Sequence, residues 1–181
     1  MEEPEEKLVE RAKKDPEAFG VLYERYVDQI YQYVFYRTGN RYDAEDLTAK
    51  TFYKALANLN SYRYRGLPFS AWLYRIAHNL VANWHRDRQR RKVIRLDSLV
   101  LAGKEREATE DLIESGERVE ALREAIARAA PDRQELLILK LVTGLSNKEI
   151  GRVMGRSEGA IKALYHRTLL ALKKDLQRRG F

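Results

Sequence analysis

The 181-residue sequence contains no cysteine, which excludes a disulfide framework, a thiolate metal site and a cysteine nucleophile. It has no apolar run of the roughly 18 residues that a membrane-spanning helix needs, and its acidic first residues, MEEPEEKLVE, do not form a secretory signal. The three histidines, His78, His85 and His166, have no partners at metal-ligand spacing, and there is no glycine-rich phosphate loop or nucleophile elbow. These absences predict a cytoplasmic protein that is not an enzyme, uses no cofactor or metal, and does not insert into a membrane.

The charge of the chain is unevenly distributed. The net charge is +7. Residues 1–95 carry 18 basic and 13 acidic side chains, residues 96–116 carry 2 basic and 6 acidic ones, and residues 117–181 carry 14 basic and 8 acidic ones. Two basic blocks separated by an acidic segment indicate a protein whose partners are polyanions, nucleic acid before all others.

Helical periodicity runs through both basic blocks, and no alternating strand pattern of useful length is present. Asp15 followed by Pro16 is typical of a helix start, and Gly39 of a helix end, with a further helix predicted to begin at Asp43. The sequence predicts an all-α protein of two small helical domains, 1–95 and 117–181, joined by a flexible acidic linker at 96–116.

The stretch 61–92, SYRYRGLPFSAWLYRIAHNLVANWHRDRQRRK, predicts one long amphipathic helix after a Gly66–Pro68 corner. Its predicted buried stripe is Leu73, Ile76, Ala77, Leu80 and Trp84. Its opposite face carries Trp72, Arg75, Asn79, Asn83, Arg86 and Arg90. Indole, guanidinium and carboxamide groups suit nucleic acid, because they stack on bases, meet phosphates and read base edges. The alternative is that Trp72 is a core residue and the arginines are a solvated helix end.

The segment 145–164, LSNKEIGRVMGRSEGAIKAL, predicts a helix-turn-helix. Ser146 and Glu149 form a capping box, Gly151 leaves room for a close helix crossing, and Gly155 makes the turn. Such a unit places the start of its second helix in the major groove. The residues expected there, at base edges or phosphates, are Arg156, Ser157, Glu158, Lys162, His166, Arg167 and Lys173. The alternative is a helical hairpin that only packs.

The string FSAWLYRIAHN, followed by a basic helix, closely resembles the second conserved region of bacterial RNA polymerase sigma factors. Together with the helix-turn-helix as region four, and with no region one or three between, the chain resembles the small extracytoplasmic-function (ECF) class. This resemblance implies a transcription initiation factor that binds core RNA polymerase, reads duplex DNA at the minus-thirty-five element and captures the melted minus-ten strand. It also implies an anti-sigma factor as a partner.

The resemblance further implies roles for individual residues. Asn79 matches the position that helps to form the family's pocket for a flipped-out base. The residues implied in minus-ten binding are Tyr62, Arg63, Tyr64, Arg65, Trp72, Arg75, Asn79, Asn83, Arg86, Arg88, Arg90 and Arg91. Those implied in polymerase binding are Asp43, Glu45, Asp46, Lys50 and Phe52, where Ala49–Lys50 replaces the family's usual glutamine–glutamate pair.

Two other functions fit parts of the sequence. The helix-turn-helix also resembles that of LuxR-type regulators, which bind DNA without replacing a sigma factor. A sigma mimic that titrates an anti-sigma protein is the third hypothesis, although it predicts an acidic region two rather than the basic run 86–92.

Overall fold

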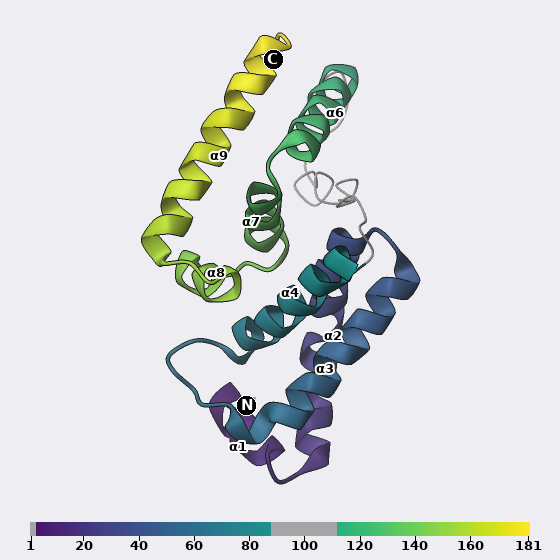
Figure 1. Cartoon of the computed structure of the whole chain (residues 1–181), viewed down its shortest axis with the longest axis vertical. Helices are drawn as coiled ribbons and strands as arrows, with labels where there is room; N and C mark the ends of the chain where they lie inside the picture. Colours follow the sequence, from purple (N-terminus) through teal and green to yellow (C-terminus); the bar gives the residue numbers. More distant parts are fainter. Residues whose placement is uncertain (1–2, 88–111) are drawn as a thin grey trace.

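The chain is all-α, as predicted. A computed structural model describes residues 3–87 and 112–181, with only the backbone given for 112–115, and the described residues contain no strand. The helices of the N-terminal unit are α1 (Glu5–Ala12), α2 (Pro16–Thr38), α3 (Arg41–Asn58), the 3-10 turn η1 (Leu59–Ser61) and α4 (Phe69–Asp87). Those of the C-terminal unit are α6 (Leu112–Arg128), α7 (Pro131–Val142), α8 (Asn147–Met154) and α9 (Glu158–Arg178). Figure 1 shows the two units stacked along the long axis, and α8 packs against α4 while α7 packs against α2.

Local capping signals fix most of the helix ends. The Asp15 side chain accepts a hydrogen bond from the N–H of Glu17, and Gly39, at φ 65°, ends α2 in the left-handed conformation. The start of α3 differs from the prediction, because the helix begins at Arg41 and not at Asp43; Asn40 caps it by accepting a 3.1 Å hydrogen bond from the Asp43 N–H. The segment 41–43 is therefore helical.

The boundary after the acidic segment also differs from the prediction. Helix α6 begins at Leu112, inside the expected linker 96–116, so Gly116 lies within a helix and does not precede one. The remaining part of that linker, 96–111, lies outside the described residues. So do Arg88, Arg90 and Arg91.

The buried face of α4 is rotated relative to the predicted stripe. Leu73 and Ala77 are buried as expected, but Ile76, Leu80 and Trp84 are only partly buried. The other buried positions of α4 are Phe69, Ala71, Tyr74, Val81 and His85. Aromatic and imidazole rings complete the core on this side, which leaves the Ile76 and Leu80 edge available to the surface.

The hydrophobic core runs through both units without interruption. It joins Tyr33, Val34 and Ala77 of the N-terminal unit to Leu136 and Ile150 of the C-terminal unit. Outside this core, Leu56 of α3 is 50% exposed and Leu141 of α7 is 57% exposed. None of the described helices is long and apolar enough to cross a membrane.

Candidate nucleic-acid interface

A carboxylate from α1 anchors the start of α4. Glu5 Oε1 accepts a 2.6 Å hydrogen bond from the backbone N–H of Phe69, and the other oxygen of Glu5 accepts one from the Tyr26 hydroxyl. Since the first N–H groups of a helix have no partner inside it, Glu5 satisfies a group that would otherwise stay unpaired. The sequence near Glu5 gives no sign of this contact, because its partner lies 64 residues further along the chain.

Three aromatic rings support the loop before α4. The ring centroids of Tyr62, Phe69 and Trp72 lie 5.0–5.4 Å from one another. Tyr62 is only 9% exposed, so its ring packs under Trp72, which differs from the expectation that Tyr62 offers its ring to DNA. Trp72 is partly buried and packs against the core. The indole of Trp72 thus packs on the core on one side and borders an open cavity on the other.

Trp72 and Asn79 line one cavity, as their spacing of two helical turns predicts. Its volume is about 310 Å³, the lower end of the range for small-ligand pockets. Asn83 and the apolar side chains of Ile76 and Leu80 complete the α4 wall. The cavity therefore offers an indole, apolar walls and amide groups to a planar, polar ligand.

The opposite wall of this cavity comes from α3 and η1. Lys54, Asn58 and Ser61 line it, and the sequence analysis singled out none of them. Asn58 Nδ2 donates to the carbonyl of Lys54 at 2.8 Å, and Ser61 Oγ donates to the carbonyl of Asn58 at 2.7 Å. Lys54 and Asn58 are polar residues four positions apart, so they share one exposed face of α3. This spacing is the sequence signal that could have identified them as part of the cavity wall.

Cations surround the aromatic cluster. Arg63 donates to the backbone carbonyls of Asn60 and Tyr62 at 2.7 and 2.9 Å, which holds its guanidinium beside the loop. Arg65 and Arg75 line a second cavity of about 220 Å³ next to Trp72. The remaining expected residues of this face, Tyr64, Asn83 and Arg86, are all exposed, and Arg86 donates to Asn83 Oδ1 at 2.7 Å.

The helix-turn-helix has the predicted geometry. The capping box of Ser146 and Glu149 is complete, with both reciprocal hydrogen bonds present, and Gly155 adopts φ 69°. A Cβ atom at Gly151 would lie 2.5 Å from the carbonyl oxygen of Arg156, so only glycine fits where the two helices cross. The N–H of Arg156 donates back to the Gly151 carbonyl at 2.8 Å. The hairpin is therefore tightly crossed, as a helix-turn-helix requires.

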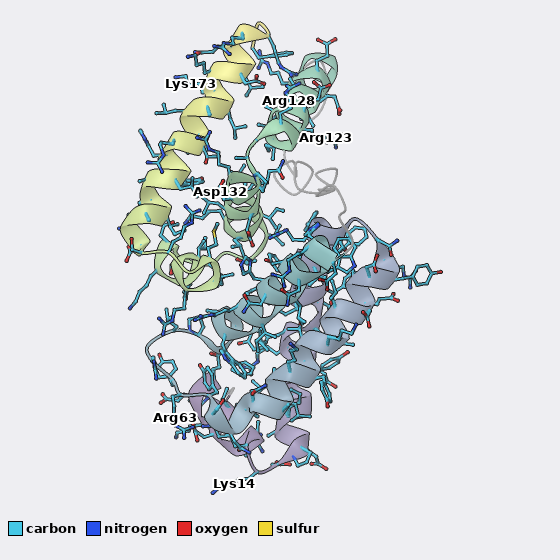
Figure 2. The ribbon with its side chains drawn as sticks, in the orientation of Figure 1. Lys14, Arg63, Arg123, Arg128, Asp132 and Lys173 are labelled. Atoms are coloured by element: carbon cyan, nitrogen blue, oxygen red, sulfur yellow. The ribbon has the colours of Figure 1, made fainter. Side chains whose placement is uncertain are left out.

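The face expected to read DNA is exposed on α9. Ser157 caps this helix by accepting from the Ala160 N–H, while Glu158, Lys162, His166 and Arg167 are exposed. Lys162 pairs with Glu158 at 2.7 Å, and Arg156 pairs with Asp132 of α7 at 3.1 Å. Lys173 lies near the upper end of the molecule in Figure 2, far from Arg63 at the lower end.

The expected polymerase-binding residues occupy α3. Asp46 pairs with Lys50 at 2.7 Å, and Glu45 pairs with Arg41 at 2.8 Å, so these charges are largely balanced within the helix. Asp43 accepts a hydrogen bond from Trp84 Nε1 at 3.2 Å and so also positions α4.

Phe52 differs from the other four expected contacts, because it is only 4% exposed, with its ring edge-on to that of the exposed Tyr23. Phe52 packs beneath α3 and stabilises its position, but its side chain is not accessible to a partner protein. The apolar groups exposed on this helix are Tyr42, Tyr53 and Leu56.

No group of three or more histidine, aspartate or glutamate side chains within residues 3–87 and 116–181 is placed to hold a metal ion. The N-terminal unit thus presents a small half-apolar cavity bordered by cations, and the C-terminal unit presents an exposed polar helix start.

Comparison with known proteins identifies both halves of the chain. The family model for sigma-70 region 2 matches residues 22–91, and that for sigma-70 region 4 matches residues 119–172. The ECF RNA polymerase sigma factor BldN of Streptomyces coelicolor is 39% identical over 170 residues, covering 93% of this chain but 64% of BldN. SigW of Bacillus subtilis, also an ECF sigma factor, is 32% identical over 98% of this chain and 99% of its own length.

A solved structure has a similar fold. CnrH, in complex with the cytosolic domain of CnrY, superposes with a TM-score of 0.68 at 24% identity, covering 96% of this chain and 97% of that one. Because both sigma regions match in order and a full-length relative exceeds 30% identity, the chain belongs to the ECF sigma factors, which are transcription initiation factors rather than enzymes.

Proposed function

We propose that this chain joins core RNA polymerase and captures an unpaired base of the minus-ten strand in the cavity between α3 and α4. The observation that carries the proposal is the placement of Trp72 and Asn79 on one cavity whose far wall bears Lys54 and Asn58. A stacked duplex presents base edges only in its grooves, whereas this cavity admits a base face against an indole and apolar walls. Amide groups on both walls supply donors and acceptors for a base edge.

Arginines beside the cavity bind the phosphate backbone of the same DNA strand. Arg63, Arg65 and Arg75 lie on the loop and the first turns of α4, next to Trp72. Guanidinium groups bind phosphate without reading sequence, so these residues position the strand while the cavity selects the base. Melting is driven by this binding energy, and the chain needs no hydrolytic or transfer chemistry of its own.

The start of α9 supplies the contacts to the minus-thirty-five duplex. Exposed residues on the first turns of the second helix of a helix-turn-helix meet base edges in the major groove. In the free chain Glu158 and Lys162 pair with each other, so each exchanges its partner for DNA on binding. Arg156 and Lys173 serve as phosphate contacts.

Arg167→Ala and Lys162→Ala should weaken promoter binding by the assembled holoenzyme. The loss should be about 1–3 kcal/mol for a residue that makes a bidentate base contact, and discrimination at that base pair should relax. The measurement is competitive binding of promoter fragments that differ at single minus-thirty-five positions. Arg178→Ala, an exposed charge at the far end of α9, is the matched control. Unchanged discrimination in both variants would show that another face reads the DNA.

The exposed face of α3 is the proposed polymerase contact. It combines Asp46 and Lys50 with the apolar groups of Tyr42, Tyr53 and Leu56. An exposed patch of this mixed character is typical of a protein interface. Asp43 and Glu45 flank it, and Phe52 holds the helix in place from the core.

The proposed partners are core polymerase, promoter DNA in duplex and single-stranded form, and an anti-sigma factor in the cytoplasm. The sigma factor RpoE of Bartonella quintana has a similar fold, with a TM-score of 0.61 to this chain, and its structure was solved in complex with the anti-sigma factor NepR. The regulator and the titrating mimic both predict a chain that forms no active holoenzyme. Failure of the parent chain to bind core polymerase at low salt would favour them.

A further inference from the structure

Helix α1 contacts both ends of the loop that precedes α4. At one end, Glu5 Oε1 accepts the 2.6 Å hydrogen bond from the backbone N–H of Phe69. At the other end, Lys13 Nζ donates to the backbone carbonyl of Tyr62 at 3.1 Å. The loop 63–68 lies between these two points, and Figure 1 shows α1 beside it at the lower end of the molecule. One helix therefore holds the loop at its entry and at its exit.

Helix α1 is itself fixed to the core of the N-terminal unit. Leu8, Val9 and Ala12 are no more than 5% exposed. The Lys13 side chain is only 11% exposed and also pairs with Glu10, so its ammonium group is held in one place. Contacts from a fixed helix to both ends of a loop restrict the loop as a whole, because the backbone cannot shift at either end.

The two contacts satisfy backbone groups that regular structure leaves unpaired. Phe69 is the first residue of α4, so its N–H has no acceptor inside the helix. A carboxylate at this place also interacts favourably with the helix dipole, and its hydrogen bond is stronger than one between neutral groups. Tyr62 follows the end of η1, and its carbonyl accepts from the side chains of Lys13 and Arg63.

The ends of the loop determine where its arginines lie. Arg63 donates to the same Tyr62 carbonyl that Lys13 holds. Arg65 lines the cavity next to Trp72. A binding loop that is ordered before its ligand arrives loses less conformational entropy on binding, and so binds more tightly. Contacts that order this loop should therefore strengthen binding of the strand that these arginines contact.

We propose that α1 is a clamp that positions the loop 63–68 for the minus-ten strand, with Glu5 and Lys13 as its two positioning residues. Neither side chain needs to touch DNA, because each acts through the backbone at one end of the loop. The family model for region 2 begins at residue 22, so α1 lies outside the segment that it matches. The consequence for DNA binding rests on the proposed function, whereas the restriction of the loop does not.

Loop mobility in the free full-length chain tests the clamp. Because the sequence has no cysteine, Tyr64→Cys gives a unique spin-label site at an exposed position of the loop. The electron paramagnetic resonance spectrum of this chain should be dominated by slowly moving label. Glu5→Ala and Lys13→Met should each raise the ratio of fast to slow label by about fivefold, the typical effect of one lost hydrogen bond.

Glu6→Ala and Lys14→Met are the matched controls. Glu6 is an exposed acidic residue in the same first turn of α1 as Glu5, and Lys14 is an exposed lysine next to Lys13. Neither forms a hydrogen bond with the loop within the part of the chain that the structure describes, so both variants should keep the slow spectrum. A label that stays slow in Glu5→Ala and Lys13→Met, or that becomes equally fast in the controls, would overturn the clamp.

Conservative variants distinguish the clamp from a general loss of stability. Glu5→Gln keeps a side-chain oxygen for the Phe69 N–H, and Lys13→Arg keeps a donor for the Tyr62 carbonyl, so both should retain the slow spectrum. Circular dichroism melting checks that each variant is folded. If Glu5→Ala releases α1 from the core, Lys13→Met remains the test, because it keeps the apolar stem of the side chain.

A second readout links the clamp to DNA and is made without the Tyr64→Cys change. The probe is a fluorescein-labelled single-stranded 15-mer with the minus-ten sequence of a promoter that the chain uses, bound by the assembled holoenzyme. The Kd should rise about fivefold in Glu5→Ala and Lys13→Met and stay at the parent value in the control and conservative variants. A fast loop with unchanged DNA affinity would support the clamp and contradict the proposed minus-ten surface. A slow loop in variants that bind the 15-mer normally would contradict the clamp alone.

Discussion

Asn79→Ala and Trp72→Ala should leave binding of closed duplex promoter nearly unchanged and slow open-complex formation by about 1–3 kcal/mol each, or roughly five- to 150-fold. Both residues line the cavity between α3 and α4, the proposed site of the unpaired base. Asn79 is the cleaner probe, because it is exposed and makes no side-chain hydrogen bond within the part of the chain that the structure describes. Trp72 also packs on Tyr62 and Phe69. Stopped-flow fluorescence of a base analogue at minus ten reports the opening rate.

Two controls separate melting from folding and from selectivity. A template already unpaired across the minus-ten element should recover the part of the rate that was lost to melting, but not the base selectivity that Asn79 supplies. Gln32→Ala removes an exposed amide on α2, away from the cavity, and should behave as the parent. If Asn79→Ala unfolds the N-terminal unit and spares opening by the folded fraction, the assigned role of Asn79 is wrong.

Gly151→Val should destabilise the helix-turn-helix by at least about 3 kcal/mol and abolish minus-thirty-five recognition. A Cβ atom at this position meets the backbone oxygen of Arg156 at 2.5 Å, and backbone cannot move aside as a flexible side chain can. The start of α9 must then shift away from α8, which displaces the whole reading face. Urea unfolding followed by near-ultraviolet circular dichroism gives the loss of stability.

Gly159→Val is the matched control, eight residues further along the chain. A Cβ atom at Gly159 meets nothing within 4 Å, and valine is slightly better than glycine inside a helix. This variant should therefore be neutral or slightly stabilising. Equal losses at Gly151 and Gly159 would mean that the close crossing has no special role.

Features set by short-range chemistry were predictable from sequence. The Ser146–Glu149 capping box, the Gly155 turn and the Asp15 cap each depend on atoms within a few residues of one another. The position of Trp72 and Asn79 on one face of α4 followed from their helical spacing, whereas the α3 wall of their cavity did not. Among the described residues, every charged side chain expected on the DNA-reading faces is exposed, because the charge pattern of a helix indicates its solvent-facing side.

Features set by tertiary contact were not predictable. The rotation of the α4 stripe arises because Tyr74 and His85 pack inward, His85 with its Nε2 3.0 Å from the carbonyl of Arg37, and a polar ring is not counted in an apolar pattern. In the sequence, Glu5 of α1 and Glu135 of α7 look like ordinary surface charges. Their hydrogen-bond and ion-pair donors, the Phe69 N–H and the Arg37 guanidinium, lie on helices distant in sequence. A carboxylate buried by such partners carries no local signal.

Transcription by core RNA polymerase supplemented with the purified chain tests the central claim most directly. With genomic DNA as template and start sites mapped at single-base resolution, the chain should direct initiation at a limited set of promoters that share minus-ten and minus-thirty-five sequences about 25 base pairs apart. Core enzyme alone should show none of these starts, and Asn79→Ala should lose them selectively. Starts that are unchanged when the chain is omitted, or promoters that share only the minus-thirty-five sequence, would contradict the account.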